Sequence, residues 1–169
     1  MKKGSFYTIL ICCSLLFMVA CGLDTKVAQV GRTAPDFSLV DRQGKTWTLS
    51  ELRGQVVFVN FWATWCPPCR EEMPSMQKLH EMLPKDKFKM LAILNNDDPA
   101  LVDKFAAKLG LTMPILDDHD NTVGLKYGLT GLPETFIVNK KGMLVRKFVG
   151  PARWVDSRYI KMLQMFIDQ

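Results

Sequence analysis

The sequence predicts an α/β domain. Residues 56–61 are an uncharged run of β-branched and aromatic side chains, which is typical of a strand buried on both faces. Residues 70–83 then place apolar side chains at helical spacing, and residues 88–94 and 100–109 repeat the order of buried strand and amphipathic helix. In the helix over 100–109, the side chains expected to face inward are Leu101, Val102, Phe105, Ala106 and Leu109, and Gly110 is its stop.

The remaining elements are predicted from local patterns. A lead-in hairpin is expected over 31–52, because residues 45–49 alternate polar and apolar side chains after a turn at 41–44. The later part of the chain is expected to hold a short strand, a short helix, a hairpin of two strands and a closing helix. These elements are expected at 114–117, 122–127, 134–139 with 143–150, and 154–167.

Two cysteines stand where the buried strand ends and the first helix begins. A helix start leaves N–H groups unpaired and is partly positive, so a thiolate there is stabilised and its pKa falls. If Cys66 is the N-cap, Pro67 and Pro68 fill the first helical positions, where a missing N–H costs little, and Cys69 lies one turn on. The prolines also remove two donors to the thiolate. We therefore expect a modestly lowered pKa at Cys66 and a reductant rather than an oxidant.

A metal site and a structural disulfide are the alternatives for this pair. A zinc site needs four ligands, but the mature chain has no second thiol pair, and His80 and His119 are distant in sequence. A structural bridge across so short a loop would stabilise little. A redox-active disulfide is therefore favoured, with no metal and no cofactor.

The composition suits one domain with a sizeable core. The chain has 169 residues, with 22 basic against 17 acidic side chains. This excess is mild, and no basic cluster with interleaved aromatic residues is present, so nucleic acid is not expected as a partner.

Residues 1–20 read as a targeting segment, with Lys2 and Lys3 before an apolar run that is shorter than the ~20 residues of a spanning helix. Its end, Met18-Val19-Ala20-Cys21-Gly22, resembles a bacterial lipoprotein signal. The resemblance implies cleavage before Cys21 and lipid on its sulfur, whereas an ordinary cleaved signal or a retained anchor is the alternative. We expect an exported, tethered protein with a linker over 21–30 and a domain over 31–169, in the periplasm or on the outer face of the cell membrane. Cleavage would leave the domain without a spare thiol, which suits an oxidising compartment.

The order of elements around Trp65-Cys66-Pro67-Pro68-Cys69 resembles the thioredoxin superfamily, and more closely its exported TlpA/ResA/CcmG (DsbE) branch. The marks of that branch are the segments at 34–37, 60–69, 72–74, 99–117 and 131–136. The resemblance implies a central mixed sheet flanked by helices, with an N-terminal β-hairpin and an inserted helix–strand unit.

The resemblance also implies roles for the site. Cys66 looks like the attacking cysteine and Cys69 the resolving one. Pro133 looks like the cis-proline that faces the disulfide, which would leave the backbone of Leu132 free to pair with a substrate strand. An ordinary trans proline at a strand start is the alternative. Trp65 is a candidate for the contact surface, with Pro67 and Pro68 beside it.

Two glutamates are candidate site residues. Glu72 lies three residues beyond Cys69, so the two residues can share one helix face, and Glu72 could take or give the Cys69 proton. The alternative is a plain acidic residue at a helix start. Glu134 follows Pro133 as in the CcmG type, where an acid lines the site, or it is a solvated carboxylate at a strand start. Thioredoxins of the cytoplasm place a buried aspartate at the position of Asn60, so an uncharged residue there leaves Glu72 as the proton carrier.

The sequence therefore predicts a thiol–disulfide oxidoreductase that reduces a disulfide-containing protein. The resemblance suggests apocytochrome c as substrate and a membrane electron donor of CcdA/DsbD type. The alternatives are an oxidase or isomerase of the same fold, a thiol peroxidase and a copper-handling module. The lead-in at 34–37 also resembles that of peroxiredoxins, but their Pro-x-x-x-Thr-x-x-Cys site is absent. A copper site would need a histidine pattern that the sequence lacks.

Overall fold

The structure is a computed structural model, and it describes residues 27–169. The predicted signal peptide over 1–20, the lipidated Cys21 and most of the predicted linker lie outside the described residues. Within residues 27–169, no helix combines the length and the apolar character needed to cross a membrane.

A five-stranded mixed sheet forms the centre of the domain, in the order β5-β4-β3-β6-β7. Strands β3, β4 and β5 run parallel, whereas β6 pairs antiparallel with both β3 and β7. Their bounds are β3 Val56–Trp62, β4 Phe88–Asn95, β5 Ile115–Asp118, β6 Glu134–Val138 and β7 Leu144–Val149. The predicted α/β class with a central mixed sheet is confirmed.

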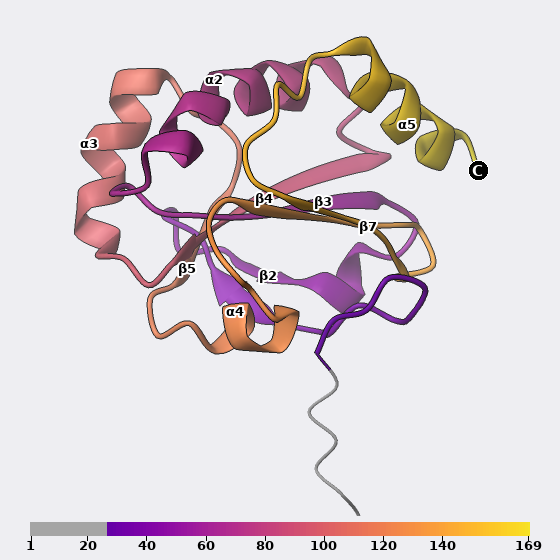
Figure 1. The fold of residues 1–169 in the computed structure, drawn as a ribbon, viewed down its shortest axis with the longest axis horizontal. Helices are drawn as coiled ribbons and strands as arrows, with labels where there is room; N and C mark the ends of the chain where they lie inside the picture. The colour runs from indigo at the N-terminus through magenta and orange to yellow at the C-terminus, as the bar shows by residue number, and fades with distance from the viewer. Residues whose placement is uncertain (1–26) are drawn as a thin grey trace, which may run out of the picture.

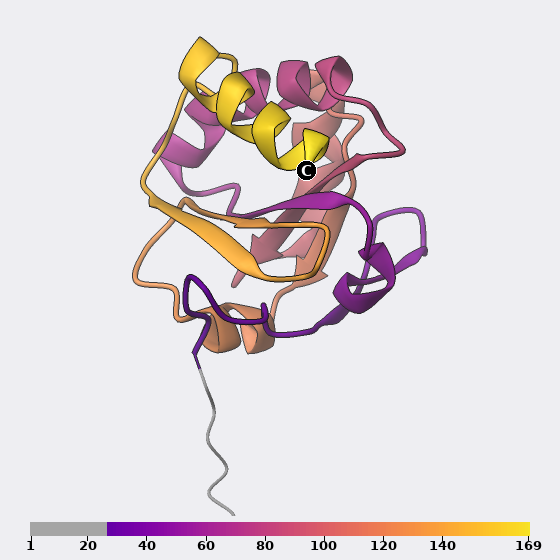
Figure 2. The same cartoon turned by 90° about the vertical axis from the view of Figure 1, so that its right-hand side faces the viewer.

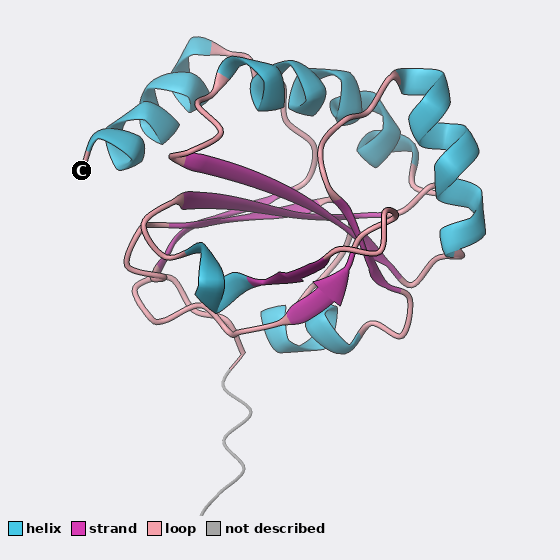
Figure 3. Cartoon of the chain, turned by 180° about the vertical axis from the view of Figure 1, so that it is seen from behind, coloured by secondary structure: helices cyan, strands magenta, loops and turns pink. Residues whose placement is uncertain are grey.

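Helices cover both faces of this sheet (Figures 1 and 2). Helices α2 (Pro67–Met82), α3 (Pro99–Leu109) and α5 (Ser157–Asp168) lie on one face. The other face carries α4 and the lead-in hairpin, as the view from behind also shows (Figure 3). These elements are α4 Thr122–Tyr127, β1 Ser38–Val40, β2 Thr46–Thr48 and the 3-10 turn η2 Leu49–Leu52.

The alternation of side chains along β3 decides what faces the helices. Phe58 and Trp62 lie in the core beneath α2, α3 and α5, while Val59 and Phe61 lie in the core beneath α4 and the lead-in. Asn60 shares its parity with Phe58 and Trp62, and it is fully buried. A polar amide is therefore placed inside the protein on the α2 side of the sheet.

Two details of the predicted helices are wrong. The closing helix begins at Ser157 and not at Trp154, because Trp154 lies in the preceding loop, where its ring is buried among aromatic side chains. Leu101 does not face inward but is 54% exposed, since the buried face of α3 is formed by Val102 and Ala106.

Candidate active site

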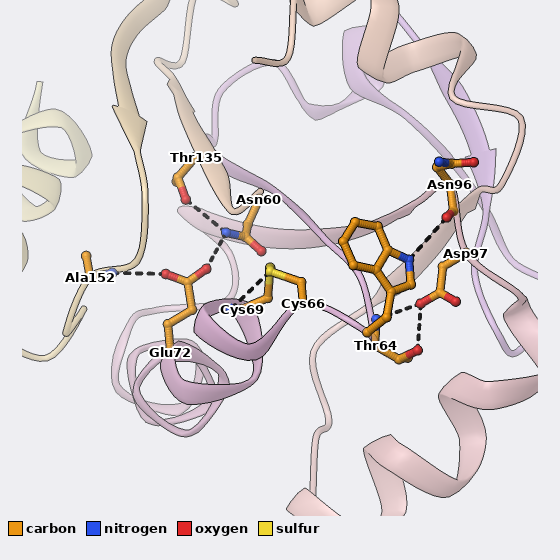
Figure 4. The surroundings of a disulfide bond; sticks show 10 residues. Asn60, Thr64, Cys66, Cys69, Glu72, Asn96, Asp97, Thr135 and Ala152 are labelled. Carbon is orange, nitrogen blue, oxygen red and sulfur yellow. Dashed lines mark hydrogen bonds between the residues drawn. A yellow bond between two sulfur atoms is a disulfide. The ribbon is translucent and has the colours of Figure 1, made fainter. Parts of the chain in front are cut away.

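Cys66 and Cys69 form a disulfide bond at the start of α2 (Figure 4). Cys66 is the N-cap of this helix, and its sulfur accepts the backbone N–H of Cys69 at 3.3 Å. Pro67 and Pro68 occupy the first helical positions, as the sequence predicts. Both cysteines are buried, and Cys66 is 4% exposed against 0% for Cys69, so Cys66 is the more accessible of the two.

Glu72 lies one turn beyond Cys69, and its carboxylate is buried and held by three donors. Asn60 Nδ2 donates to Oε1 at 2.9 Å, while the Ala152 N–H and the Trp154 indole donate to Oε2 at 3.1 and 3.0 Å. Burial raises the pKa of Glu72 to about 7, although these hydrogen bonds act to lower it. Glu72 is thus not a plain solvated acid, and it can change protonation near neutral pH.

Asn60 links this carboxylate to the sheet. Its Nδ2 also donates to Thr135 Oγ1 on β6 at 2.9 Å. Its Oδ1 is buried without a hydrogen-bond partner among the described residues. Figure 4 shows the Asn60 side chain pointing toward Glu72 and the two cysteines. An amide, unlike an aspartate, brings no second negative charge to this interior.

Of the other predicted contact residues, Trp65, Pro67 and Pro68 adjoin Cys66 in the chain, and Leu132 packs against the core cluster that holds both cysteines. The Leu132–Pro133 peptide bond is cis, as expected. Leu132 is half-buried, and its N–H and C=O make no backbone hydrogen bond among residues 27–169. The Trp65 side chain is 59% exposed, and Pro67 is exposed beside it. Trp65 and Pro67 therefore form an exposed surface next to Cys66.

Asp97, in the loop between β4 and α3, was missed by the sequence analysis. Its carboxylate accepts the N–H and the hydroxyl of Thr64 at 2.6 and 2.7 Å. The carbonyl of Asn96 accepts the indole N–H of Trp65 at 3.3 Å. This loop therefore anchors the turn that carries Cys66. In the sequence, Asp97 and Asp98 precede Pro99, a pattern typical of a turn and helix start, and nothing local indicates the contact with Thr64.

The structure does not bring Glu134 to the cysteines. Glu134 shares its parity along β6 with Phe136, which packs on the α4 face of the sheet. It is not a solvated carboxylate either, because it is fully buried and pairs with Lys147 Nζ at 2.8 Å. Burial alone would raise the pKa of Glu134, but Lys147 and the bonds from Thr130 outweigh it and hold that pKa below its usual value. No observed contact supports the prediction that Glu134 lines the site.

Fold and site together define a thioredoxin-like thiol–disulfide oxidoreductase. The AhpC/TSA family matches residues 30–147, and the chain belongs to this family, within its thioredoxin-like TlpA/ResA/CcmG branch. The chain is 44% identical to the thiol-disulfide oxidoreductase ResA of Geobacillus thermodenitrificans over 122 residues. The aligned region covers 72% of this chain and 70% of the relative.

Two further comparisons agree with this assignment. ResA of Halalkalibacterium halodurans is 37% identical over 127 residues, 75% of this chain and 72% of that protein. A crystal structure from Chlorobium tepidum, described as a thiol:disulfide interchange protein DsbE, aligns with a TM-score of 0.74 at 25% identity. It covers 83% of this chain and 99% of the Chlorobium chain.

Proposed function

We propose that this oxidoreductase reduces disulfide bonds of partner proteins outside the cytoplasm, as a step in cytochrome c maturation. The observation that supports this direction of electron flow is the small number of hydrogen bonds to the Cys66 sulfur. Among the described residues, its sulfur accepts one backbone N–H, from Cys69, because Pro67 and Pro68 have none to donate. Weak stabilisation of a Cys66 thiolate favours the disulfide form of the enzyme, and hence a reductant.

The reaction follows the exchange chemistry of a dithiol. The Cys66 thiolate attacks one sulfur of the partner disulfide, so a mixed disulfide forms and the other partner sulfur leaves as a thiolate that is then protonated. Cys69 loses its proton and attacks Cys66, and the bond between Cys66 and the partner breaks. The partner gains two electrons and two protons, and the enzyme ends as the Cys66–Cys69 disulfide.

Glu72 is proposed to take the proton that Cys69 releases. It is buried one turn from Cys69, and burial brings its pKa to about 7, near the pH at which it would work. The proposed contact surface for the partner consists of Trp65, Pro67, Pro68 and Leu132. The backbone of Leu132 would pair with an extended strand of the partner. Apocytochrome c is the proposed partner.

A membrane protein of CcdA/DsbD type is proposed to return the enzyme to its dithiol form, because an oxidising compartment would otherwise leave it oxidised. A lipid on Cys21 is proposed to tether the domain at 31–169 to the membrane through the linker at 21–30. Replacing Cys21 by serine is expected to release the exported protein into the soluble fraction, and retention in the membrane would contradict the tether.

The reduction potential tests the direction of electron flow. The chain is titrated against glutathione or dithiothreitol with Cys12, Cys13 and Cys21 replaced by serine, so that only the active pair responds. We expect about −220 mV or lower, in the range of thioredoxin-like reductants. A value of about −120 mV would place the protein with DsbA-like oxidants and refute the proposal.

A deletion strain tests the biological role. Loss of the gene is expected to lower c-type cytochrome content, with recovery by the wild-type chain but not by a Cys66→Ser variant. A full cytochrome content in the deletion strain would contradict the maturation role. Rapid turnover of hydrogen peroxide by the reduced protein would instead favour a thiol peroxidase.

A further inference from the structure

The loop between β7 and α5 closes over the carboxylate of Glu72. Its Ala152 N–H and the Trp154 indole N–H both donate to Oε2, and they stand 80 and 82 residues from Glu72 in the sequence. Figure 4 shows the Ala152 end of this clamp on the side of Glu72 that faces away from the cysteines. The loop between β7 and α5 thus holds the Glu72 carboxylate, although Glu72 itself belongs to α2.

Trp154 is itself held firmly. It is fully buried, and its ring centroid lies 4.7 Å from that of Phe58, 5.4 Å from Phe148 and 4.8 Å from Tyr159. Its backbone N–H donates to the hydroxyl of Ser75 at 3.1 Å. The indole cannot turn away from Glu72 without disturbing this aromatic cluster.

Ser75 joins the loop to the helix that carries the cysteines. Its hydroxyl lies 2.8 Å from the carbonyl oxygen of Glu72 and 3.3 Å from that of Ala152, as well as accepting from Trp154. The loop is therefore tied to α2 at Ser75 and at the Glu72 side chain. This double attachment keeps the indole N–H aimed at one carboxylate oxygen.

We propose that Trp154 is a positioning residue for thiol–disulfide exchange, whose indole N–H fixes the Glu72 carboxylate and favours its charged, proton-accepting form. The inference rests on the proposed role of Glu72. In the resolving step, the Cys69 proton moves to Glu72, and the Cys69 sulfur forms the bond to Cys66. The bond between Cys66 and the partner breaks, and its electron pair leaves on the partner sulfur. Trp154 touches none of these reacting atoms and acts through Glu72.

Burial raises the proton affinity of Glu72, and the hydrogen bonds to its carboxylate lower that affinity. On the side of the sheet, Asn60 of β3 donates to Glu72, and Thr135 of β6 accepts from Asn60. Both side chains are uncharged. An open cleft of about 320 Å³ joins Glu72 to solvent, and the charged groups that line it are Glu71 on α2 and Arg153 on the loop. Both are exposed to water, which screens their charge. The same cleft gives the proton a route to solvent.

The test compares two tryptophan-to-phenylalanine variants of the whole chain. Trp154→Phe removes the donor to Glu72. Trp62→Phe is the matched control, because Trp62 is also fully buried near the cysteines, but its indole N–H has no partner among residues 27–169. The titration of the Glu72 carboxyl is followed by ¹³C NMR in the oxidised protein. The pH dependence of single-turnover reduction of a disulfide substrate is measured in parallel.

We expect the Glu72 midpoint to rise by about one pH unit in Trp154→Phe, since one charge-assisted hydrogen bond is lost. The rate profile should move in the same direction, and Trp62→Phe should leave both unchanged. Equal midpoints in the two variants would overturn the inference. If Trp154→Phe does not fold, site-specific benzothienylalanine at position 154 keeps the ring shape and lacks the N–H, and it is held to the same expectation.

Glu72→Gln separates this inference from the proposed function. The Gln variant is expected to lose the pH dependence that wild type shows near 7, and adding Trp154→Phe to it should then change nothing further. If Glu72→Gln keeps the wild-type profile, the proposed role of Glu72 fails and the inference fails with it. If Glu72→Gln alters the profile but Trp154→Phe does not move the midpoint, the inference alone fails.

Discussion

Asn60 on β3 donates a hydrogen bond of 2.9 Å to Glu72 on α2, so that an uncharged strand residue holds the buried acid of the helix. The two residues meet because Asn60 has the strand parity that faces α2, and Glu72 lies one turn beyond Cys69. The site thus contains one carboxylate at this interface where an aspartate at position 60 would make two. Glu72 can then change its protonation without competition from a second acid.

Replacing Asn60 by aspartate should create a coupled pair of acids. Two carboxyl groups within hydrogen-bond distance cannot both ionise freely, so the pair should titrate in two steps, with the upper step about one pH unit or more above that of wild-type Glu72. The ¹³C titration of the carboxyl groups measures both steps. Asn60→Leu is the control that removes the donor without adding a charge. A single unshifted transition in Asn60→Asp would contradict the close contact.

The stability of the protein should depend on pH through Glu72. Its pKa is about 7 in the folded chain against an ordinary 4.5, so the folded state binds more protons between these values. The contribution of Glu72 to stability is therefore fully present below about pH 4.5 and is lost as the pH rises through 7. Between pH 4 and pH 8 this loss should be about 3 kcal/mol.

Glu72→Gln removes this dependence. Urea unfolding of wild type and variant at pH 4 and pH 8 measures it as a difference of differences, which cancels the constant effect of the amide on packing. The variant should gain stability relative to wild type on going from pH 4 to pH 8. A gap between the two proteins that stays constant with pH would show that burial does not raise the pKa of Glu72.

The two cysteines should behave differently when each is replaced by serine. Cys69→Ser should accumulate a covalent 1:1 adduct with a disulfide-bonded protein, because the mixed disulfide on Cys66 is not resolved. Cys66→Ser should form little adduct, since Cys69 is fully buried behind it. Non-reducing electrophoresis and intact mass measure the adduct. Equal trapping by both variants would refute the assignment of Cys66 as the attacking residue.

Glu134 should affect stability more than exchange. Glu134→Gln keeps the acceptor for Thr130 but removes the charge that pairs with Lys147. The free energy of unfolding should therefore fall by about 1–3 kcal/mol. The exchange rate should change less than twofold, because Glu134 points to the face of the sheet opposite the cysteines. Glu51→Gln, at an exposed position, is the control for loss of one negative charge. A tenfold loss of exchange rate in Glu134→Gln would restore it to the catalytic site.

Much of this arrangement was predictable because its signals are local. The buried strand before Cys66, the prolines after it and the place of Glu72 one turn beyond Cys69 all follow from residues that are near neighbours in the sequence. The start of α5 was misplaced for the opposite reason. Trp154 stands just before the helical pattern of Tyr159, Leu163 and Phe166, which suggests an earlier helix start, but its ring packs against Phe58 and Phe148 from the loop.

The sequence by itself indicated the chemistry of the site, since a cysteine pair at a helix start after a buried strand favours a redox-active disulfide. Only the tertiary structure decided the burial of Glu72, which raises its pKa, and the pairing of Glu134 with Lys147 on the other face of the sheet. The partners of Glu72 come from β3 and from a loop 80 residues away, and the partner of Glu134 comes from the neighbouring strand. Proton affinity depends on burial and on donors in space, and neither is a property of residues adjacent in the chain.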